Sequence, residues 1–114
     1  MEFNVKEFKE LIEEQIQEKL ELNIDTSGDI PTFFFENNNI QLSVCTQDDI
    51  FTILNIEITN QGEGTGSTIY ESIEEFCVDN GYSEIIANKV KSSAIPFWEN
   101  FDFEETGEDM IKYL

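Results

Sequence analysis

A glycine-rich turn, QGEGTGS at residues 61–67, separates two apolar periodicities and limits how this chain can fold more than any other feature. Before it, residues 50–59 alternate apolar and polar side chains with the two-residue period of a strand. After it, residues 68–81 repeat apolar side chains every three or four positions, the period of a helix that would end at Gly81. Residues 82–90 predict another strand, so a βαβ unit with two parallel strands is expected.

The residues before this unit predict one helix and two further strands. Residues 4–22 carry an apolar stripe at helical spacing, and Asn4 followed by Glu7 is typical of a helix start. Residues 32–36 and 40–46 predict a hairpin around an asparagine-rich turn, and with the strand before the glycine turn they would form an antiparallel meander. Turn residues dominate between the helix and the hairpin, so no strand is expected there.

The residues after the βαβ unit predict a short helix and one or two terminal strands. Ser93 has the side chain of a helix N-cap, and it would place Pro96 in the first turn, where the missing N–H does no harm. The tail turns at Gly107. At 114 residues the chain is expected to form a single α/β domain, residues 1–114, built on a mixed sheet.

The charge of the chain narrows the classes of function. The net charge is −19, all six basic residues are lysines, and the sequence contains no arginine and no histidine. A field of this sign repels nucleic acids and anionic membranes, and it attracts amines, polyamines and basic protein surfaces. The lack of histidine removes the commonest metal ligand and the commonest general base, so no metal site is expected.

The cysteines and the N-terminus indicate a reducing compartment. Cys45 falls in an apolar strand and Cys77 on an apolar helix face, and two isolated cysteines do not form a disulfide framework. We expect both to be buried free thiols. The N-terminus lacks the pattern of a signal peptide, and no stretch approaches the roughly 18 apolar residues of a membrane span, so a cytoplasmic protein is expected. The sequence leaves monomer and homodimer open.

A strand, a glycine-rich turn and a helix start together predict an anion site. The first N–H groups of a helix lack partners within the helix, and the helix dipole adds a partial positive charge there. A P-loop would need a lysine before Gly66-Ser67, which is missing. A dinucleotide-binding fold would need alternating parallel strands, whereas an antiparallel meander precedes this turn.

The turn resembles a known signature. Gln61-x-x-Gly64-x-Gly66 is similar to the Q/R-x-x-G-x-G/A motif of the GNAT N-acetyltransferase superfamily. Further along, SSAIPFWENFDFEET resembles the second block of that family, A-I-x-F-Y-E-K-L-G-F-E, in Ala94-Ile95, Phe97-Trp98-Glu99 and Phe103-Glu104. The resemblance covers about residues 50–114, with the N-terminal part matching only in outline, as in a small, compact member.

The resemblance implies that acetyl-CoA binds in a V-shaped opening between two splayed parallel strands. Edge groups of the first strand, around Ile56 and Ile58, would pair with the pantetheine arm. Lys91 would contact the cofactor or remain a plain surface lysine. Backbone amides of the turn would hold the pyrophosphate, through Gln61, Gly62, Glu63, Gly64, Thr65, Gly66 and Ser67. The acidic Glu63 departs from the family pattern and would repel phosphate unless it points to solvent.

The resemblance also implies direct attack of an amine on the thioester, without a covalent acyl-enzyme. Strand alternation places Glu57 opposite the face that carries Leu54, Ile56 and Ile58, where many relatives use a strand glutamate through a water molecule. We therefore expect Glu57 to be a partly buried general base, although a solvated strand glutamate is an equal alternative.

The resemblance leaves several candidates for the proton donor to the leaving thiolate. Trp98 stands where the family often has a tyrosine, and an indole cannot give up a proton at useful pH. Ser93 or water would take that role. Three tyrosines remain as alternatives that the sequence cannot rank, namely Tyr70, Tyr82 and Tyr113.

Two functions follow. The first is an acetyl-CoA-dependent N-acetyltransferase that moves acetyl to a primary amine of a cationic acceptor, such as a polyamine, a protein lysine or an N-terminal amine. The second is a non-catalytic acidic protein or inhibitor on the same fold that binds a basic protein. The intact glycine turn favours the first function, and the charge density favours the second.

Overall fold

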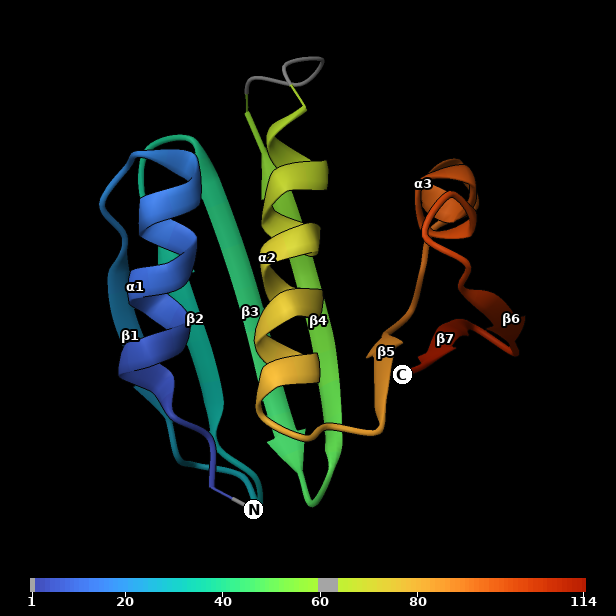
Figure 1. Ribbon diagram of the computed structural model, residues 1–114, viewed down its shortest axis with the longest axis horizontal. Helices are drawn as coiled ribbons and strands as arrows, with labels where there is room; N and C mark the ends of the chain where they lie inside the picture. The colour runs from blue at the N-terminus through green and yellow to red at the C-terminus, as the bar shows by residue number, and fades with distance from the viewer. Residues whose placement is uncertain (1, 60–63) are drawn as a thin grey trace.

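The strands assemble into one continuous sheet on which the amphipathic helices pack, as the computed structural model in Figure 1 shows. The structure describes residues 2–59 and 64–114. The helical segments are α1 Val5–Ile16, α2 Thr65–Asp79, a 3-10 turn Ser92–Ala94 and α3 Ile95–Glu99. The strands are β1 Glu21–Asp25, β2 Thr32–Glu36, β3 Ile40–Gln47, β4 Ile50–Ile58, β5 Glu84–Ala87, β6 Glu104–Thr106 and β7 Asp109–Tyr113.

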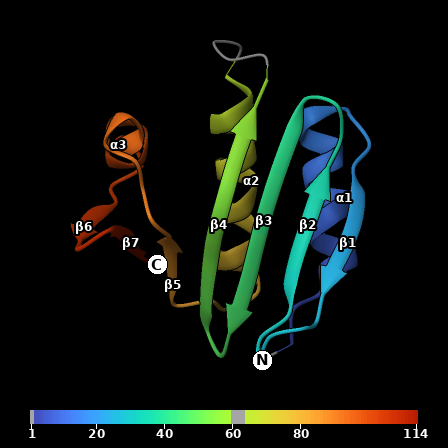
Figure 2. The same ribbon diagram turned by 180° about the vertical axis from the view of Figure 1, so that it is seen from behind.

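The sheet has the strand order β1-β2-β3-β4-β5-β7-β6. Strands β1 to β4 form an antiparallel meander, β4 and β5 are parallel, and the β6–β7 hairpin adds antiparallel to β5. The predicted meander, parallel βαβ unit and mixed sheet are therefore confirmed. Helices α1 and α2 lie side by side on one face of the sheet, and Figure 2 shows the opposite face with the strands in front of them.

Aromatic side chains fill the layer between these helices and the sheet. Phe8 of α1 is fully buried, and its ring centroid lies 5.1 Å from that of Phe76 on α2 and 5.2 Å from that of Phe35 on β2. Large aromatic side chains dominate core energetics because each buries so much surface. Among the described residues, no helix has the length and apolar character that crossing a membrane requires.

The ends of α2 follow the predicted signals with one shift. The helix begins at Thr65, three residues earlier than the periodicity predicts. It ends at Asp79, and Gly81 follows with φ +79°, the left-handed conformation that suits glycine at a helix end. The strand predicted over residues 82–90 is shorter and covers only Glu84–Ala87.

The first helix ends earlier than predicted. Its start is confirmed, because the backbone N–H of Glu7 donates to Asn4 Oδ1 at 3.1 Å. A helix over residues 4–22 is wrong, however, since Gln17 turns the chain with φ +57° and strand β1 begins at Glu21. Strand β1 was not expected. It pairs in full with β2, from Glu21 opposite Glu36 to Asp25 opposite Thr32.

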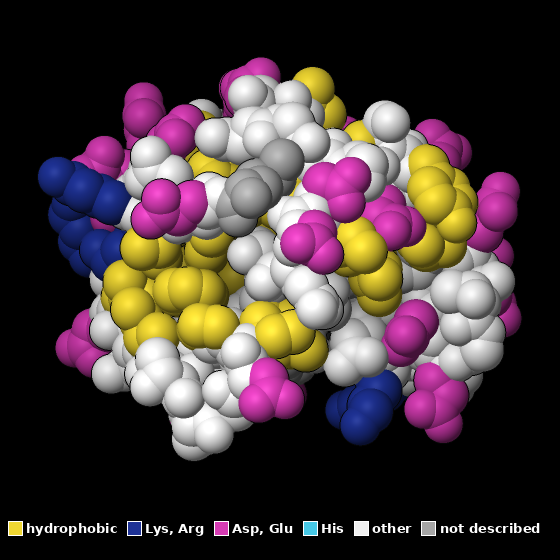
Figure 3. Space-filling view, turned by 90° about the horizontal axis from the view of Figure 1, so that it is seen from below, with side chains coloured by type: hydrophobic (Ala, Val, Ile, Leu, Met, Phe, Trp, Pro, Cys, Tyr) yellow, Lys and Arg dark blue, Asp and Glu magenta, His cyan; other side chains and the backbone are white. Residues whose placement is uncertain are grey.

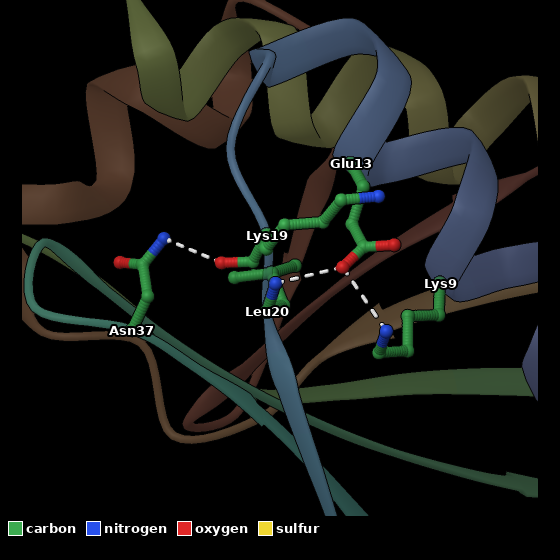
Figure 4. Close-up of polar contacts among 5 residues, drawn as sticks. All are labelled: Lys9, Glu13, Lys19, Leu20 and Asn37. Atoms are coloured by element: carbon green, nitrogen blue, oxygen red, sulfur yellow. Dashed lines mark hydrogen bonds and ion pairs between the residues drawn. The ribbon is translucent and has the colours of Figure 1, made fainter.

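A buried carboxylate holds the connection between α1 and β1 (Figure 4). Glu13 is only 8% exposed, and its Oε2 accepts the backbone N–H of Leu20 at 2.7 Å and the Nζ of Lys9 at 3.0 Å. Asn37 adds a bond from its side-chain amide to the carbonyl of Lys19 at 3.1 Å. Burial disfavours the charged form, but the Leu20 and Lys9 donors outweigh it, so the pKa of Glu13 is lowered.

Candidate active site

A bulge interrupts β4 in its middle. Ser43 of β3 lies opposite Asn55, but the next residue, Val44, lies opposite Ile53, so Leu54 has no cross-strand partner. One extra residue on a strand bends it and shifts its side-chain alternation. The predicted alternation of Leu54, Ile56 and Ile58 with exposed polar residues is confirmed, but the bulge shifts it out of phase with the buried Phe51 and Ile53 before it. After the bulge, the strand aims its last residues at the start of α2.

Strands β4 and β5 separate just beyond the bulge. Their parallel pairing covers Ile50–Ile53 with Glu84–Ala87, and the N–H of Asn88 makes a last bond to the Ile53 carbonyl at 2.9 Å. The segment that follows β5 then turns away from β4 toward the β6–β7 hairpin, where the N–H of Val90 donates to the carbonyl of Glu108 at 2.8 Å. The predicted opening between two splayed parallel strands is thus present, as a cavity of about 150 Å³ that we call the inter-strand cavity.

The start of α2 presents backbone N–H groups that have no acceptor within the helix. Gly64 has φ +75°, and its carbonyl accepts the N–H of Thr68 at 3.0 Å, the first bond of the helix. The N–H groups of Thr65, Gly66 and Ser67 precede that bond, so they have no acceptor within the helix, and the helix dipole reinforces their positive charge. A helix start of this kind is where anions bind in proteins, and the prediction that these three residues bind one stays a prediction.

A second and larger hollow of about 610 Å³, which we call the large cavity, joins this helix start to the end of β4 and to α3. Gly66 lies between two of its walls, because a Cβ added there would reach van der Waals contact with both, 3.4 Å from Cδ1 of Ile58 and 3.6 Å from Cε1 of Phe97. Seven predicted site residues line the large cavity together with Ala94, Phe97 and Trp98. The seven are Ile56, Ile58, Gly64, Thr65, Gly66, Ser67 and Ser93.

The remaining predicted residues lie elsewhere. Glu57 and Lys91 both line the inter-strand cavity, so the structure brings these two together but not with the start of α2. The expected partial burial of Glu57 is wrong, because its side chain is exposed. Its cross-strand neighbour is Gln41. The predictions for Gln61, Gly62 and Glu63 fall outside the described residues.

Ser93 reaches the large cavity by a different local structure than expected. It is exposed and lies in the 3-10 turn that precedes α3, in which the N–H of Ala94 donates to the Lys91 carbonyl at 2.9 Å. The predicted role of Ser93 as helix N-cap is wrong, since α3 starts after Ala94 and has no side-chain cap. Pro96 does lie in the first turn, as expected.

The three tyrosines do not line either cavity as the structure describes it. Burial, reinforced by Glu74, raises the pKa of Tyr70, and burial also raises that of Tyr82, so neither hydroxyl is suited to proton transfer near neutral pH. Tyr113 is 71% exposed at the end of β7.

The aromatic residues of α3 form more of the cavity walls than the sequence predicts. Trp98 is only 7% exposed, yet it lines both cavities. Its ring meets that of Phe97 edge to face at a centroid distance of 5.0 Å and that of Tyr70 at 5.6 Å. The sequence indicates inward-facing aromatic residues in this helix, but it gives no signal that Phe97 faces the large cavity.

Charge is unevenly distributed around the site. None of the described residues that line the large cavity carries a charge. At the opposite end of the molecule, which carries the N-terminus and is seen in Figure 3, acidic side chains are spread over the surface and lysines gather at two places. Within residues 2–59 and 64–114, no group of three or more acidic or cysteine side chains is arranged to hold a metal ion. Cys77 is buried as predicted, whereas Cys45 is only half-buried.

The strand order, the bulged and splayed β4 and the glycine-led helix define the GNAT N-acetyltransferase fold, which several solved N-acetyltransferase structures share with this chain. Elp3 from the archaeon Methanocaldococcus infernus matches with a TM-score of 0.66 at 13% identity over 84% of this chain. The anti-CRISPR protein AcrVA5 matches with a TM-score of 0.59 at 19% identity over 71% of this chain and 97% of its own.

A third similar structure is the PaiA N-acetyltransferase from Thermoplasma acidophilum in complex with coenzyme A, with a TM-score of 0.55 at 13% identity, over 70% of this chain and 57% of that one. The present chain spans only 30% of the Elp3 chain. At sequence identities this low, the structural similarity establishes the fold and nothing beyond it. Neither protein-family profiles nor the sequences of curated proteins match this sequence.

Proposed function

We propose that this protein is an acetyl-CoA-dependent N-acetyltransferase that acetylates a primary amine of a cationic acceptor by direct attack. The observation that carries the proposal is the large cavity, in which free N–H groups at the start of α2 meet the end of β4. Backbone donors at a helix start suit a pyrophosphate, and the exposed edge of β4 around Ile56 and Ile58 suits the amides of a pantetheine arm. The coenzyme A complex of the PaiA N-acetyltransferase supports this class of cofactor.

The large cavity would bind the cofactor, and the inter-strand cavity would hold the reacting atoms. They share Ile56, Ala94 and Trp98, so a pantetheine arm that runs along β4 from the large cavity would bring its thioester to the inter-strand cavity. There the amine nitrogen would attack the carbonyl carbon of the bound thioester, the C–S bond would break and coenzyme A would leave as the thiolate. Holding both reactants in place supplies much of the rate enhancement in such a transfer.

Glu57 is our candidate for the base that accepts the proton of the amine. Its exposed position suits proton transfer through a water molecule, because a buried carboxylate could not exchange protons with solvent as readily. Lys91 lines the same cavity, where it would contact the pantetheine end of the cofactor and attract the departing thiolate. Ser93, which lines the large cavity, or water would donate a proton to the thiolate.

The negative charge of the protein indicates the class of acceptor. A net charge of −19 favours the approach of cations, and Glu57 places one of these charges beside the reacting atoms. Polyamines, lysine side chains and N-terminal amines meet this requirement, whereas amines that also carry a carboxylate would be repelled. The alternative of a non-catalytic acidic binding protein gives no reason for a helix start that opens into a cavity of this size.

Turnover in matched variants tests the proposal. We expect Glu57→Gln to lower kcat/KM for a polyamine by about 100-fold, the usual contribution of a general base. Binding of acetyl-CoA should not change, because Glu57 does not line the large cavity. Glu99→Gln is the control, since it removes the same charge from an exposed site on α3 that lines neither cavity. Equal turnover in the two variants would remove Glu57 from the mechanism.

A further inference from the structure

The lysines of this chain lie away from the large cavity. Three of the six occur within the first 20 residues, on α1 or just after it. Lys112 of β7 forms an ion pair with Glu74 of α2. Lys89 and Lys91 line the inter-strand cavity instead. The described lining of the large cavity contains no cation, and the sequence of residues 60–63 contains none either.

This arrangement matters for coenzyme A, which carries two separate anionic groups. Its pyrophosphate can be neutralised by the N–H groups and the dipole of α2. Its 3′-phosphate is a monoester with about −1.5 to −2 charge near neutral pH, and proteins usually match such a group with arginine or lysine. In this protein a 3′-phosphate beyond the start of α2 would instead meet the negative field of a chain with 19 excess negative charges.

From this we infer that the acyl-donor site selects the pantetheine and pyrophosphate portion of its donor and discriminates against the 3′-phosphate. The donor class therefore includes acyl thioesters of dephospho-coenzyme A, which bind at least as tightly as the coenzyme A thioester. This inference rests on the proposed acyl transfer. It adds a preference that the fold does not dictate, since the preference comes from the lack of a lysine or arginine among the described residues that line the large cavity.

The same charge repulsion determines how salt changes the affinity for coenzyme A. A phosphate site built from lysine or arginine loses affinity as salt rises. Here salt screens a repulsion, because raising the ionic strength from about 10 mM to about 100 mM shortens the Debye length from roughly 30 Å to roughly 10 Å. Coenzyme A should therefore bind more tightly at the higher salt, and dephospho-coenzyme A should respond less.

Calorimetric titration of the purified protein with coenzyme A and with dephospho-coenzyme A, at both ionic strengths, tests the inference. We expect Kd for dephospho-coenzyme A to be about two- to fivefold lower at low salt, with the difference shrinking at high salt. Coenzyme A binding tenfold more tightly, or losing affinity as salt rises, would overturn the inference and leave the proposed function standing. Binding of neither ligand would overturn the proposed function and the inference with it.

A matched pair of variants separates the cavity from the net charge. Ser93→Lys adds a cation at the large cavity, and it should remove the preference for dephospho-coenzyme A and reverse the salt effect. Val78→Lys adds the same charge at a 60% exposed position near the other end of α2, so it should leave both unchanged. An equal response of the two variants would contradict selection by the cavity.

Discussion

Replacing Glu13 by glutamine should lower the free energy of unfolding, because Glu13 holds the connection between α1 and β1. The carboxylate is buried, and Oε2 accepts two donors, the backbone N–H of Leu20 and the Nζ of Lys9. A hydrogen bond to a charged group contributes about 1.5–3 kcal/mol, and an i,i+4 pair on a helix surface about 0.3–0.5 kcal/mol. Glutamine keeps the volume and can still accept the Leu20 N–H, so we expect a loss of about 1–2 kcal/mol.

Thermal unfolding at pH 7 measures this loss. For a domain of this size 1–2 kcal/mol corresponds to a Tm lowered by roughly 5–10 °C. Glu14→Gln is the matched control, because Glu14 is the exposed neighbour on the same helix, and surface changes of this kind stay within about 0.5 kcal/mol. A Tm for Glu13→Gln equal to that of Glu14→Gln would refute the assigned role of the carboxylate.

The pH dependence gives an independent check. The pKa of Glu13 is lower in the folded state than its ordinary value of 4.5, so the charged form stabilises the fold above that value. The contribution is lost as pH falls through the folded pKa. The gap in Tm between the wild type and Glu13→Gln should therefore be full at pH 7 and shrink below pH 4.5. A gap that stayed constant down to low pH would contradict the lowered pKa.

Three further predictions concern the site and the thiols. Gly64→Ala should lower the free energy of unfolding by about 1–2 kcal/mol, because φ is +75° there, whereas Gly64→Asn should cost less, and urea unfolding distinguishes them. Phe97→Ala should weaken acetyl-CoA binding about tenfold in calorimetry, since it removes a wall of the large cavity, at a typical cost of 1–2 kcal/mol; unchanged affinity would contradict that placement. Burial raises the pKa of both thiols, but Cys45 is half-buried and Cys77 is buried, so a thiol reagent at pH 8 should modify Cys45 slowly and Cys77 only after unfolding.

The sequence predicts the fold wherever its periodicity is strong. The two-residue alternation before the glycine turn and the helical period after it define β4 and α2, and their short connections define the meander. Strand β1 is missed because it is an edge strand whose residues are mostly exposed, so it shows no apolar alternation. The early end of α1 depends on Gln17 in the left-handed conformation, which is uncommon for a residue other than glycine.

The site is predictable in part for the same reason. Glycine at 64 indicates the helix start, because its positive φ suits glycine, and at Gly66 a Cβ would already touch Ile58 and Phe97. The bulge at Leu54 is hidden, since apolar residues occur on both sides of it and the alternation resumes afterwards. The position of Phe97 at the large cavity depends on tertiary packing of α3, which no local pattern encodes.

Binding of acetyl-CoA to the wild type, Gly66→Val and Gly28→Val tests the central claim most directly. A valine at 66 would place methyl groups between Ile58 and Phe97, whereas a Cβ at Gly28 would meet only the Ile30 carbonyl at 3.9 Å. We predict that acetyl-CoA at a thousandfold excess over Kd stabilises the wild type and Gly28→Val by about 4 kcal/mol, and that folded Gly66→Val shows no shift in Tm. No shift in the wild type, or an equal shift in Gly66→Val, would contradict the assignment of the large cavity as the acyl-donor site.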